Sequence, residues 1–223
     1  GTWTSVINGG YSNYICSYSC ESVINGGYRN DIYSSCRSAI LGGRGHFIGY
    51  TGYNIIAGGG YSDICCSSYS SILGGCNNRI CNGNYYASVI GGYNNLIYCC
   101  NSYSSIIGGC ANQIYCQSGS STIIGGSGNC VNCYSCRSSI VGGCNNTICC
   151  SCNSSIIGGC NLILEQLHET VLVPNLSTGT VSNATFSQWK LGKPILATTT
   201  FDDTQYVEVS IDGTIYKLAV VTS

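Results

Sequence analysis

A pair of glycines recurs along the first part of the chain at a nearly constant interval. The second glycine of each pair stands at ten positions: Gly10, Gly27, Gly43, Gly59, Gly75, Gly92, Gly109, Gly126, Gly143 and Gly159. Successive pairs are always 16 or 17 residues apart. A fixed period of this size is typical of a solenoid, in which each repeat is one coil that stacks on its neighbours. We therefore expect a stack of ten coils.

Two aliphatic positions accompany every glycine pair. In the coil of Gly109 they are Ile106 and Ile114, and across all ten coils both positions hold Ile or Val, with the one exception of Leu164. β-Branched residues on both sides of a turn, within alternating sequence, favour short strands over helix. The sequence thus predicts an all-β fold, a parallel β-solenoid or β-roll of ten coils of 16–17 residues, with two strands in each coil.

Small polar residues precede these aliphatic positions by two. Ser104 and Asn112 illustrate the pattern, and serine and asparagine recur at the same places in other coils. Residues two apart in a strand share a face, so we expect both to point inward, where stacked side chains can hydrogen-bond along the solenoid axis. His46 occupies one of the asparagine positions. We interpret it as a polar replacement within that ladder rather than as a catalytic base.

Composition divides the chain in two. All 19 cysteines lie at or before Cys160, whereas both prolines and all three lysines lie beyond it. This change predicts a solenoid domain over residues 1–164 and a C-terminal neck and assembly or capping domain over residues 165–223. Within the second part, residues 204–221 alternate around Asp212-Gly213, which predicts a hairpin with Glu208 opposite Lys217.

The charge balance limits the partners that the chain can have. Only 8% of the residues are charged and the net charge is −1, so there is no basic surface of the kind that binds nucleic acid. No apolar run reaches the roughly 18 residues needed to span a bilayer. We therefore expect neither a nucleic-acid partner nor a membrane span.

The cysteines allow three interpretations. Cysteines that stack on adjacent coils lie within disulfide distance, but their parallel Cβ vectors oppose a bond. We favour mostly reduced cysteines that pack as small hydrophobic residues over a continuous disulfide ladder. A metal site is the sharper alternative, because Cys130, Cys133 and Cys136 form a C-x-x-C-x-x-C run and Cys149, Cys150 and Cys152 crowd the next coil. We favour packing there too, because Cys133 belongs to a repeat column, and we expect no metal or cofactor.

Catalysis has little support in the sequence. The solenoid contains only Glu21, Asp31 and Asp63 as acids, and no coil carries the pair of carboxylates that a glycoside hydrolase or lyase needs. The glycine pairs have no phosphate-binding context around them. We therefore expect no enzymatic activity and assign no catalytic residues.

The repeats Ser138-Ser-Ile-Val-Gly-Gly-Cys-Asn-Asn-Thr-Ile and Ser154-Ser-Ile-Ile-Gly-Gly-Cys resemble the S-x-I-x-G repeats of trimeric autotransporter adhesin heads and of tail-fibre proteins from phages and large DNA viruses. The resemblance covers residues 1–164. It implies a left-handed parallel β-roll, three chains side by side, and a role in an extracellular or virion-borne fibre. The coil length, the glycine pairs and the cysteines depart from the adhesin pattern and favour a fibre or filament.

These observations predict a structural subunit of a homo-oligomeric fibre or filament, located outside the cell or on a virion surface. The core of one coil stack is thin and its outward columns are unusually apolar, so we expect several chains to associate, as a trimer or head to tail. In the head-to-tail arrangement, residues 161–223 of one subunit cover the first coil of the next, with Trp3 in the junction.

Two other functions are compatible with the sequence. The tyrosine-rich outer columns would suit a receptor- or glycan-binding adhesin or fibre tip that contacts a host surface glycan or protein. Ice binding by a flat ladder face is less well supported, because no regular Thr-x-Thr column is present.

Overall fold

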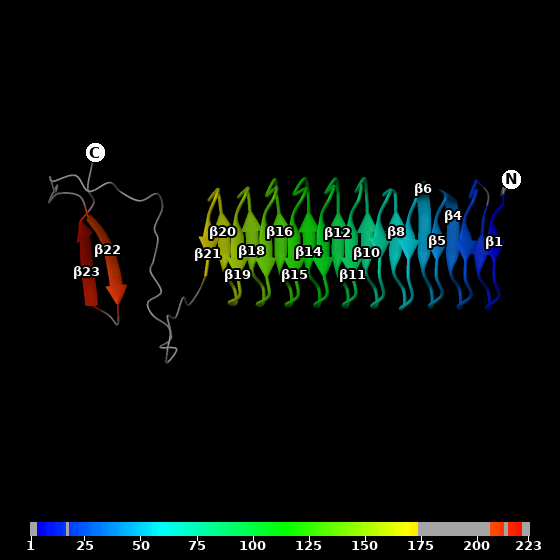
Figure 1. Cartoon of the computed structure of the whole chain (residues 1–223), viewed down its shortest axis with the longest axis horizontal. Coiled ribbons are helices and arrows are strands. Elements are labelled where there is room, and N and C mark those ends of the chain that lie inside the picture. The colour runs from blue at the N-terminus through cyan, green and yellow to red at the C-terminus, as the bar shows by residue number, and fades with distance from the viewer. Residues whose placement is uncertain (1–3, 17, 174–205, 212–213, 220–223) are drawn as a thin grey trace, which may run out of the picture. The chain divides into compact units, whose positions relative to one another are not determined.

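The computed structural model describes residues 4–16, 18–173, 206–211 and 214–219. It confirms the predicted all-β parallel solenoid of ten coils (Figure 1). The chain divides into two compact units, Gly1–Leu176 and Ser177–Ser223. The first contains the solenoid, and the described part of the second is a β-hairpin.

Each of the ten coils gives one strand to each of two parallel sheets, and Val171–Leu172 adds an eleventh strand to the first. The first sheet, in spatial order, consists of β1 (Val6–Ile7), β3 (Val23–Ile24), β5 (Ala39–Ile40), β7 (Ile55–Ile56), β9 (Ser71–Ile72), β11 (Ser88–Ile90), β13 (Ser105–Ile107), β15 (Thr122–Ile124), β17 (Ser139–Val141), β19 (Ser155–Ile157) and β21 (Val171–Leu172). The second consists of β2 (Tyr14–Ile15), β4 (Asp31–Cys36), β6 (Phe47–Gly52), β8 (Asp63–Cys65), β10 (Arg79–Cys81), β12 (Leu96–Tyr98), β14 (Gln113–Tyr115), β16 (Cys130–Asn132), β18 (Thr147–Cys149) and β20 (Ile163–Glu165). Because β20 stacks on β18 and β21 stacks on β19, both sheets continue past residue 164.

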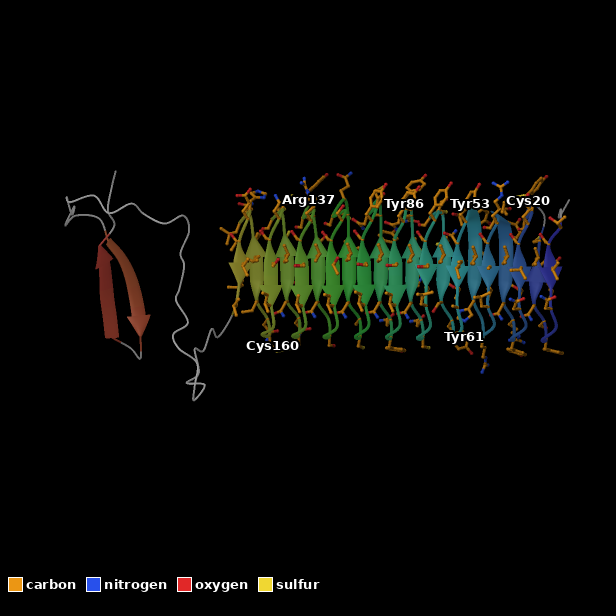
Figure 2. The ribbon with its side chains drawn as sticks, viewed as in Figure 1. Cys20, Tyr53, Tyr61, Tyr86, Arg137 and Cys160 are labelled. Carbon is orange, nitrogen blue, oxygen red and sulfur yellow. A yellow bond between two sulfur atoms is a disulfide. The ribbon has the colours of Figure 1, made fainter. Side chains whose placement is uncertain are left out.

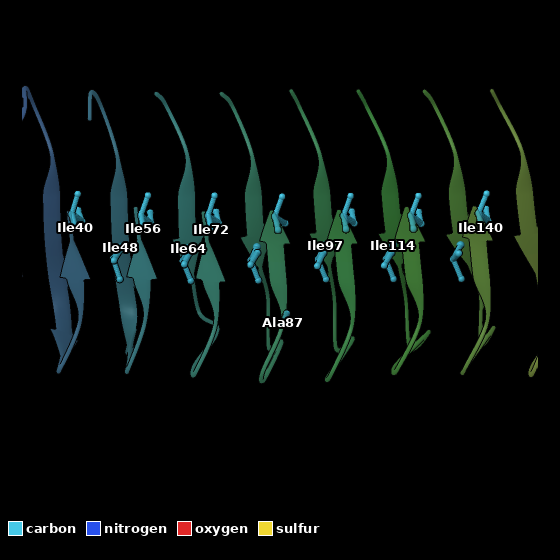
Figure 3. Packing of buried hydrophobic residues seen from close by; sticks show 14 of the residues in the cluster. Ile40, Ile48, Ile56, Ile64, Ile72, Ala87, Ile97, Ile114 and Ile140 are labelled. Carbon is cyan, nitrogen blue, oxygen red and sulfur yellow. The ribbon is translucent and has the colours of Figure 1, made fainter. Parts of the chain in front are cut away.

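The two aliphatic positions form the core between the sheets. Each Ile, Val or Leu of one coil pairs in register with its equivalent in the next, as Ile106 pairs with Ile123 and Ile97 with Ile114. From Ile24 onward every member of both columns is buried. Figure 3 shows the two rows of side chains facing each other between the strands. The predicted alternation therefore holds throughout the stack.

The serine and asparagine positions point inward, as predicted. Their hydrogen bonds, however, join a side chain to the backbone of a neighbouring coil rather than to an identical side chain. In the asparagine column, Asn112 Oδ1 accepts from the Asn129 backbone N–H at 3.0 Å, and Asn112 Nδ2 donates to the carbonyl oxygens of Gly125 and Gly126, each at 3.2 Å. Each amide thus satisfies buried backbone groups that would otherwise lack partners.

A third inner polar column was not predicted. It lies three residues before the serine column and contains Ser19, Ser35, Thr51, Ser67, Asn84, Asn101, Ser118, Ser135 and Ser151. Asn101 shows its role: its Oδ1 accepts from the Ser118 backbone N–H at 2.6 Å and its Nδ2 donates to the Ile114 carbonyl at 3.1 Å. Each coil therefore contributes one residue to each of three polar ladders, which run along the solenoid beside the aliphatic core.

The second glycine of each pair is required by a close backbone approach. Gly109 has a φ of +79°, and a Cβ added there would collide with Asn112 Nδ2 and with the Gly126 carbonyl oxygen of the next coil. At the first glycine, Gly108, the φ is +69° but nothing lies within 4 Å of the added Cβ. The first position needs a left-handed backbone, whereas the second also needs the absence of a side chain.

The difference between 16- and 17-residue coils is confined to one corner, which we call the variable corner. It follows the second-sheet strand of each coil. In a 16-residue coil it holds one residue in the left-handed region, such as Cys150 with a φ of +50°, whereas a 17-residue coil holds two, such as Cys133 and Tyr134 with φ of +46° and +59°. The sheets on either side keep their register.

The predicted hairpin is present in the second unit. β22 (Tyr206–Ile211) pairs antiparallel with β23 (Thr214–Ala219), and Glu208 lies opposite Lys217 as predicted. The turn residues Asp212 and Gly213 lie outside the described residues, as do Trp3 and most of the segment assigned to the head-to-tail junction.

Candidate interaction surfaces

An exposed aliphatic column runs along the outer face of the first sheet. Its members stand directly before the last eight of the ten glycine pairs: Leu41, Ala57, Leu73, Ile90, Ile107, Ile124, Val141 and Ile157. Apart from Ala57, they are between 39% and 48% exposed. They project outward because the residue before each of them carries the buried core side chain and strand residues alternate between faces. This row of large apolar side chains is therefore open to solvent over eight coils.

A hydroxyl column lies beside the aliphatic column on the same face. Ser105 and Thr122 contact each other through their hydroxyl oxygens at 3.3 Å, and Ser139 and Ser155 do so at 2.8 Å. Between Ala39 and Ile157 neither column contains a charged residue. The outer face of the first sheet thus presents uncharged, regularly spaced side chains.

Tyrosines form a stacked ladder at the corner before the first sheet. The rings of Tyr53, Tyr69, Tyr86 and Tyr103 are stacked in this order, with centroids 4.6, 5.0 and 5.1 Å apart. All four residues have φ between +55° and +61°, and their exposed fractions range from 43% to 65%. We call this row the tyrosine ladder, and Figure 2 shows Tyr53 and Tyr86 along one edge of the solenoid.

The tyrosine ladder ends in a charged pair. The Arg37 guanidinium lies 5.3 Å from the Tyr53 ring centroid, donates to the Tyr53 hydroxyl, and forms a 2.6 Å ion pair with Glu21. The hydrogen bond from Arg37 lowers the pKa of the Glu21 carboxyl. Both charged groups are half exposed, so this pair marks the end of the ladder more than it stabilises the fold.

A second aromatic cluster lies on the opposite edge, where Figure 2 labels Tyr61. The rings of Tyr11 and Tyr28 are stacked with centroids 5.6 Å apart. Arg29 and Arg44 lie over the Tyr28 ring at 5.1 and 5.4 Å, and Arg44 also lies 5.4 Å from the Tyr61 ring. The guanidinium groups thus continue the aromatic stack where tyrosine is replaced.

Two further acids within residues 1–164 lie on the second sheet. Asp31 and Asp63 share one outward column, with Phe47 between them. Burial raises the pKa of both carboxyls, and Arg79, 3.5 Å from Asp63, partly offsets that effect on Asp63. The two carboxylates therefore stand two coils apart.

His46 lies inside the solenoid, in the asparagine column, as we interpreted it. Its backbone N–H donates to Asn30 Oδ1 at 3.0 Å, and its Nδ1 accepts from the Ser62 backbone N–H at 3.2 Å. Burial lowers the pKa of His46, and the nearby backbone of Gly58 and Gly59 offsets part of that effect. The other ring nitrogen, Nε2, is buried and has no hydrogen-bond partner among the residues that the structure describes.

Four of the cysteines are paired in the structure. Cys20 bonds to Cys36 and Cys144 to Cys160, in both cases with Cα atoms 4.5 Å apart. The opposing direction of the Cβ vectors is therefore overcome at these two places, although no continuous ladder forms. The other fifteen cysteines carry free thiols. Among the residues that the structure describes, which include both cysteine clusters, no group of three potential ligands is placed to hold a metal ion.

Two comparisons with known proteins, one with protein families and one with curated proteins, gave no match. Over the described residues there is also no helix of the length and apolarity needed to cross a membrane. The surfaces described above are accordingly the basis for a functional assignment.

Proposed function

We propose that this chain is a structural subunit of a homo-oligomeric fibre or filament, on a virion or outside the cell. The aliphatic column is the observation that carries the proposal. Eight coils at the spacing of adjacent strands make the column about 34 Å long. The largest contiguous apolar patch on a protein surface is often a functional one.

The regularity of the face favours a second copy of this chain as the partner. The side chains of the aliphatic column recur once per coil, about every 4.8 Å. Only a surface whose side chains repeat at the same spacing can match the column over its whole length. Because the face is uncharged, two copies can approach without like-charge repulsion. A stable interface needs about 800 Å² per partner, so the corners on both sides of the sheet must also take part, as they would in a trimer.

The oligomeric state tests this proposal. The double variant Ile107→Lys/Ile124→Lys places two charges in the centre of the aliphatic column. We expect the unaltered chain to sediment as an oligomer and this variant to sediment as a folded monomer with an unchanged circular dichroism spectrum. Tyr98→Lys is the matched control, because Tyr98 is 38% exposed on the second sheet and Ile107 is 39% exposed on the first. A monomeric unaltered chain, or an oligomeric double variant, would refute the assignment.

The tyrosine ladder favours a second function, binding of a host glycan or protein. Four exposed rings in a row next to Arg37 offer apolar surface and hydrogen-bonding hydroxyls at regular intervals. A glycan array can test this with Tyr69→Ala/Tyr86→Ala, and with Tyr134→Ala as a control because Tyr134 is 64% exposed outside the ladder. Saturable binding that only the double variant loses would support it, and no binding to any glycan would favour the purely structural role.

A further inference from the structure

Two free cysteines on adjacent coils have their sulfur atoms almost in bonding contact. Cys65 ends β8 and Cys81 ends β10, and the two residues pair in register. Their Sγ atoms are 2.7 Å apart. A disulfide has an S–S length of about 2.05 Å, so bond formation needs a sulfur displacement of well under 1 Å and no rearrangement of the sheets.

Sequence spacing alone does not produce this contact. Cys136 and Cys152 are also 16 residues apart and also have free thiols. Their thiols hydrogen-bond to backbone carbonyls instead. Cys136 Sγ donates to the Gln117 carbonyl at 3.2 Å, and Cys152 Sγ donates to the Tyr134 carbonyl at 2.9 Å. Stacked thiols can thus be aligned for oxidation, as at Cys65 and Cys81, or directed to carbonyl groups, as at Cys136 and Cys152.

We propose that Cys65 and Cys81 form a redox-active dithiol, which a small-molecule disulfide such as glutathione disulfide converts into a third coil-to-coil disulfide. The other two such bonds, Cys20–Cys36 and Cys144–Cys160, also link residues 16 apart. Oxidation would therefore add a bond of the same type in the middle of the stack.

The different exposure of the two sulfurs assigns their roles. Cys65 is partly exposed, whereas Cys81 is only 2% exposed. The Cys65 thiolate attacks one sulfur of the small disulfide, which forms a mixed disulfide and releases the first small thiolate. The Cys81 thiolate then attacks Cys65 Sγ and releases the second. The two cysteines together lose two protons and two electrons, and the small disulfide gains both to become two thiols.

The chemistry of the pair is consistent with these steps. The hydrogen bond from Cys65 lowers the pKa of Cys81 to about 7, and the same bond raises the pKa of Cys65. Near neutral pH the pair thus holds a single proton, which lies on Cys65; its transfer to Cys81 across the 2.7 Å contact generates the Cys65 thiolate that attacks first. Arg79 nearby favours the thiolate of both residues, whereas Asp63 opposes that of Cys81.

Peptide mapping of the full chain after exposure to glutathione disulfide tests the proposal. We expect a Cys65–Cys81 linked peptide to appear before any Cys136–Cys152 linked peptide. In Cys81→Ser, a glutathione adduct should accumulate at Cys65 because the second step is blocked. In Cys65→Ser, the adduct at the buried Cys81 should be at least about tenfold less abundant, because an inaccessible sulfur reacts slowly.

Two results would overturn the inference. One is the absence of the Cys65–Cys81 linked peptide from the unaltered chain under glutathione disulfide. The other is oxidation of the Cys136–Cys152 pair at an equal rate, which would mean that the sulfur alignment does not decide the reaction. Both are measured on the unaltered chain, so they do not depend on the folding of either variant.

Discussion

Replacing His46 by asparagine should stabilise the solenoid. Asn78, two coils further along the same column, donates from Nδ2 to the carbonyls of Gly74, Gly91 and Gly92 at 3.2–3.3 Å. His46 instead leaves its buried Nε2 without a partner. An unsatisfied buried polar group costs about 1–3 kcal/mol. For a unit of this size, each kcal/mol raises the melting temperature by about 2–4 °C.

The gain should depend on pH. Burial lowers the pKa of His46. In the folded chain this side chain therefore stays neutral over a pH range in which it already binds a proton in the unfolded chain. Stability is therefore lost as the pH falls below the unfolded histidine pKa of about 6.5, down to the lowered folded value. His46→Asn removes this loss. The advantage of the variant should be larger at acid pH than at neutral pH.

Thermal unfolding followed by circular dichroism measures both effects, at about pH 7.5 and about pH 5, on either side of the free histidine pKa. Asn78→His is the reciprocal control, and it should lower the melting temperature and introduce a similar pH dependence. If His46→Asn melts no higher than the unaltered chain at either pH, the reasoning about the unsatisfied nitrogen is wrong. If the difference between the two melting temperatures does not grow at acid pH, the titration argument is wrong.

Further predictions concern the turns, the inner ladders and the tyrosine ladder, each measured by denaturant or thermal unfolding. Gly108→Ala should cost about 1–2 kcal/mol, the penalty of a left-handed backbone for an alanine, whereas Gly109→Ala should exceed about 4 kcal/mol because its Cβ has no space; similar costs at both would contradict the described packing. Asn112→Ala should cost more than about 3 kcal/mol, since several buried backbone groups lose their partners, and a neutral result would show that water replaces the amide. Tyr86→Ala should lose about 0.5–1.5 kcal/mol for each of two stacked contacts, while Tyr86→Phe should change little; equal losses would mean that the hydroxyl, not the stacking, matters.

The core of the solenoid could be predicted because its aliphatic residues stand at fixed distances in sequence from the glycine pairs. The asparagine column precedes the variable corner in each coil, so one extra residue does not shift it. The third inner column follows that corner, and its members include Ser, Thr and Asn, so counting forward from the glycines does not align them. Counting back three residues from the serine position, as from Ser121 to Ser118, would have revealed it.

The interaction surfaces were only partly predictable. The aliphatic column is visible as the residue before the last eight glycine pairs, but only the sheet geometry shows that it faces solvent as one row. The bonded cysteine pairs could not be chosen from spacing. Cys20–Cys36 and Cys136–Cys152 share a separation of 16 residues, yet only the first pair is bonded.

At the variable corner the number of residues in a coil can change without a change in the stacking of the strands. One codon gained or lost there changes the number of left-handed residues from one to two or back, while the strands on both sides remain aligned with their neighbours. A codon inserted within a strand would instead turn every following side chain of that strand to the opposite face. The gain or loss of a single codon at this corner therefore leaves the strand register and the number of stacked coils unchanged, whereas the addition of a whole coil lengthens the stack.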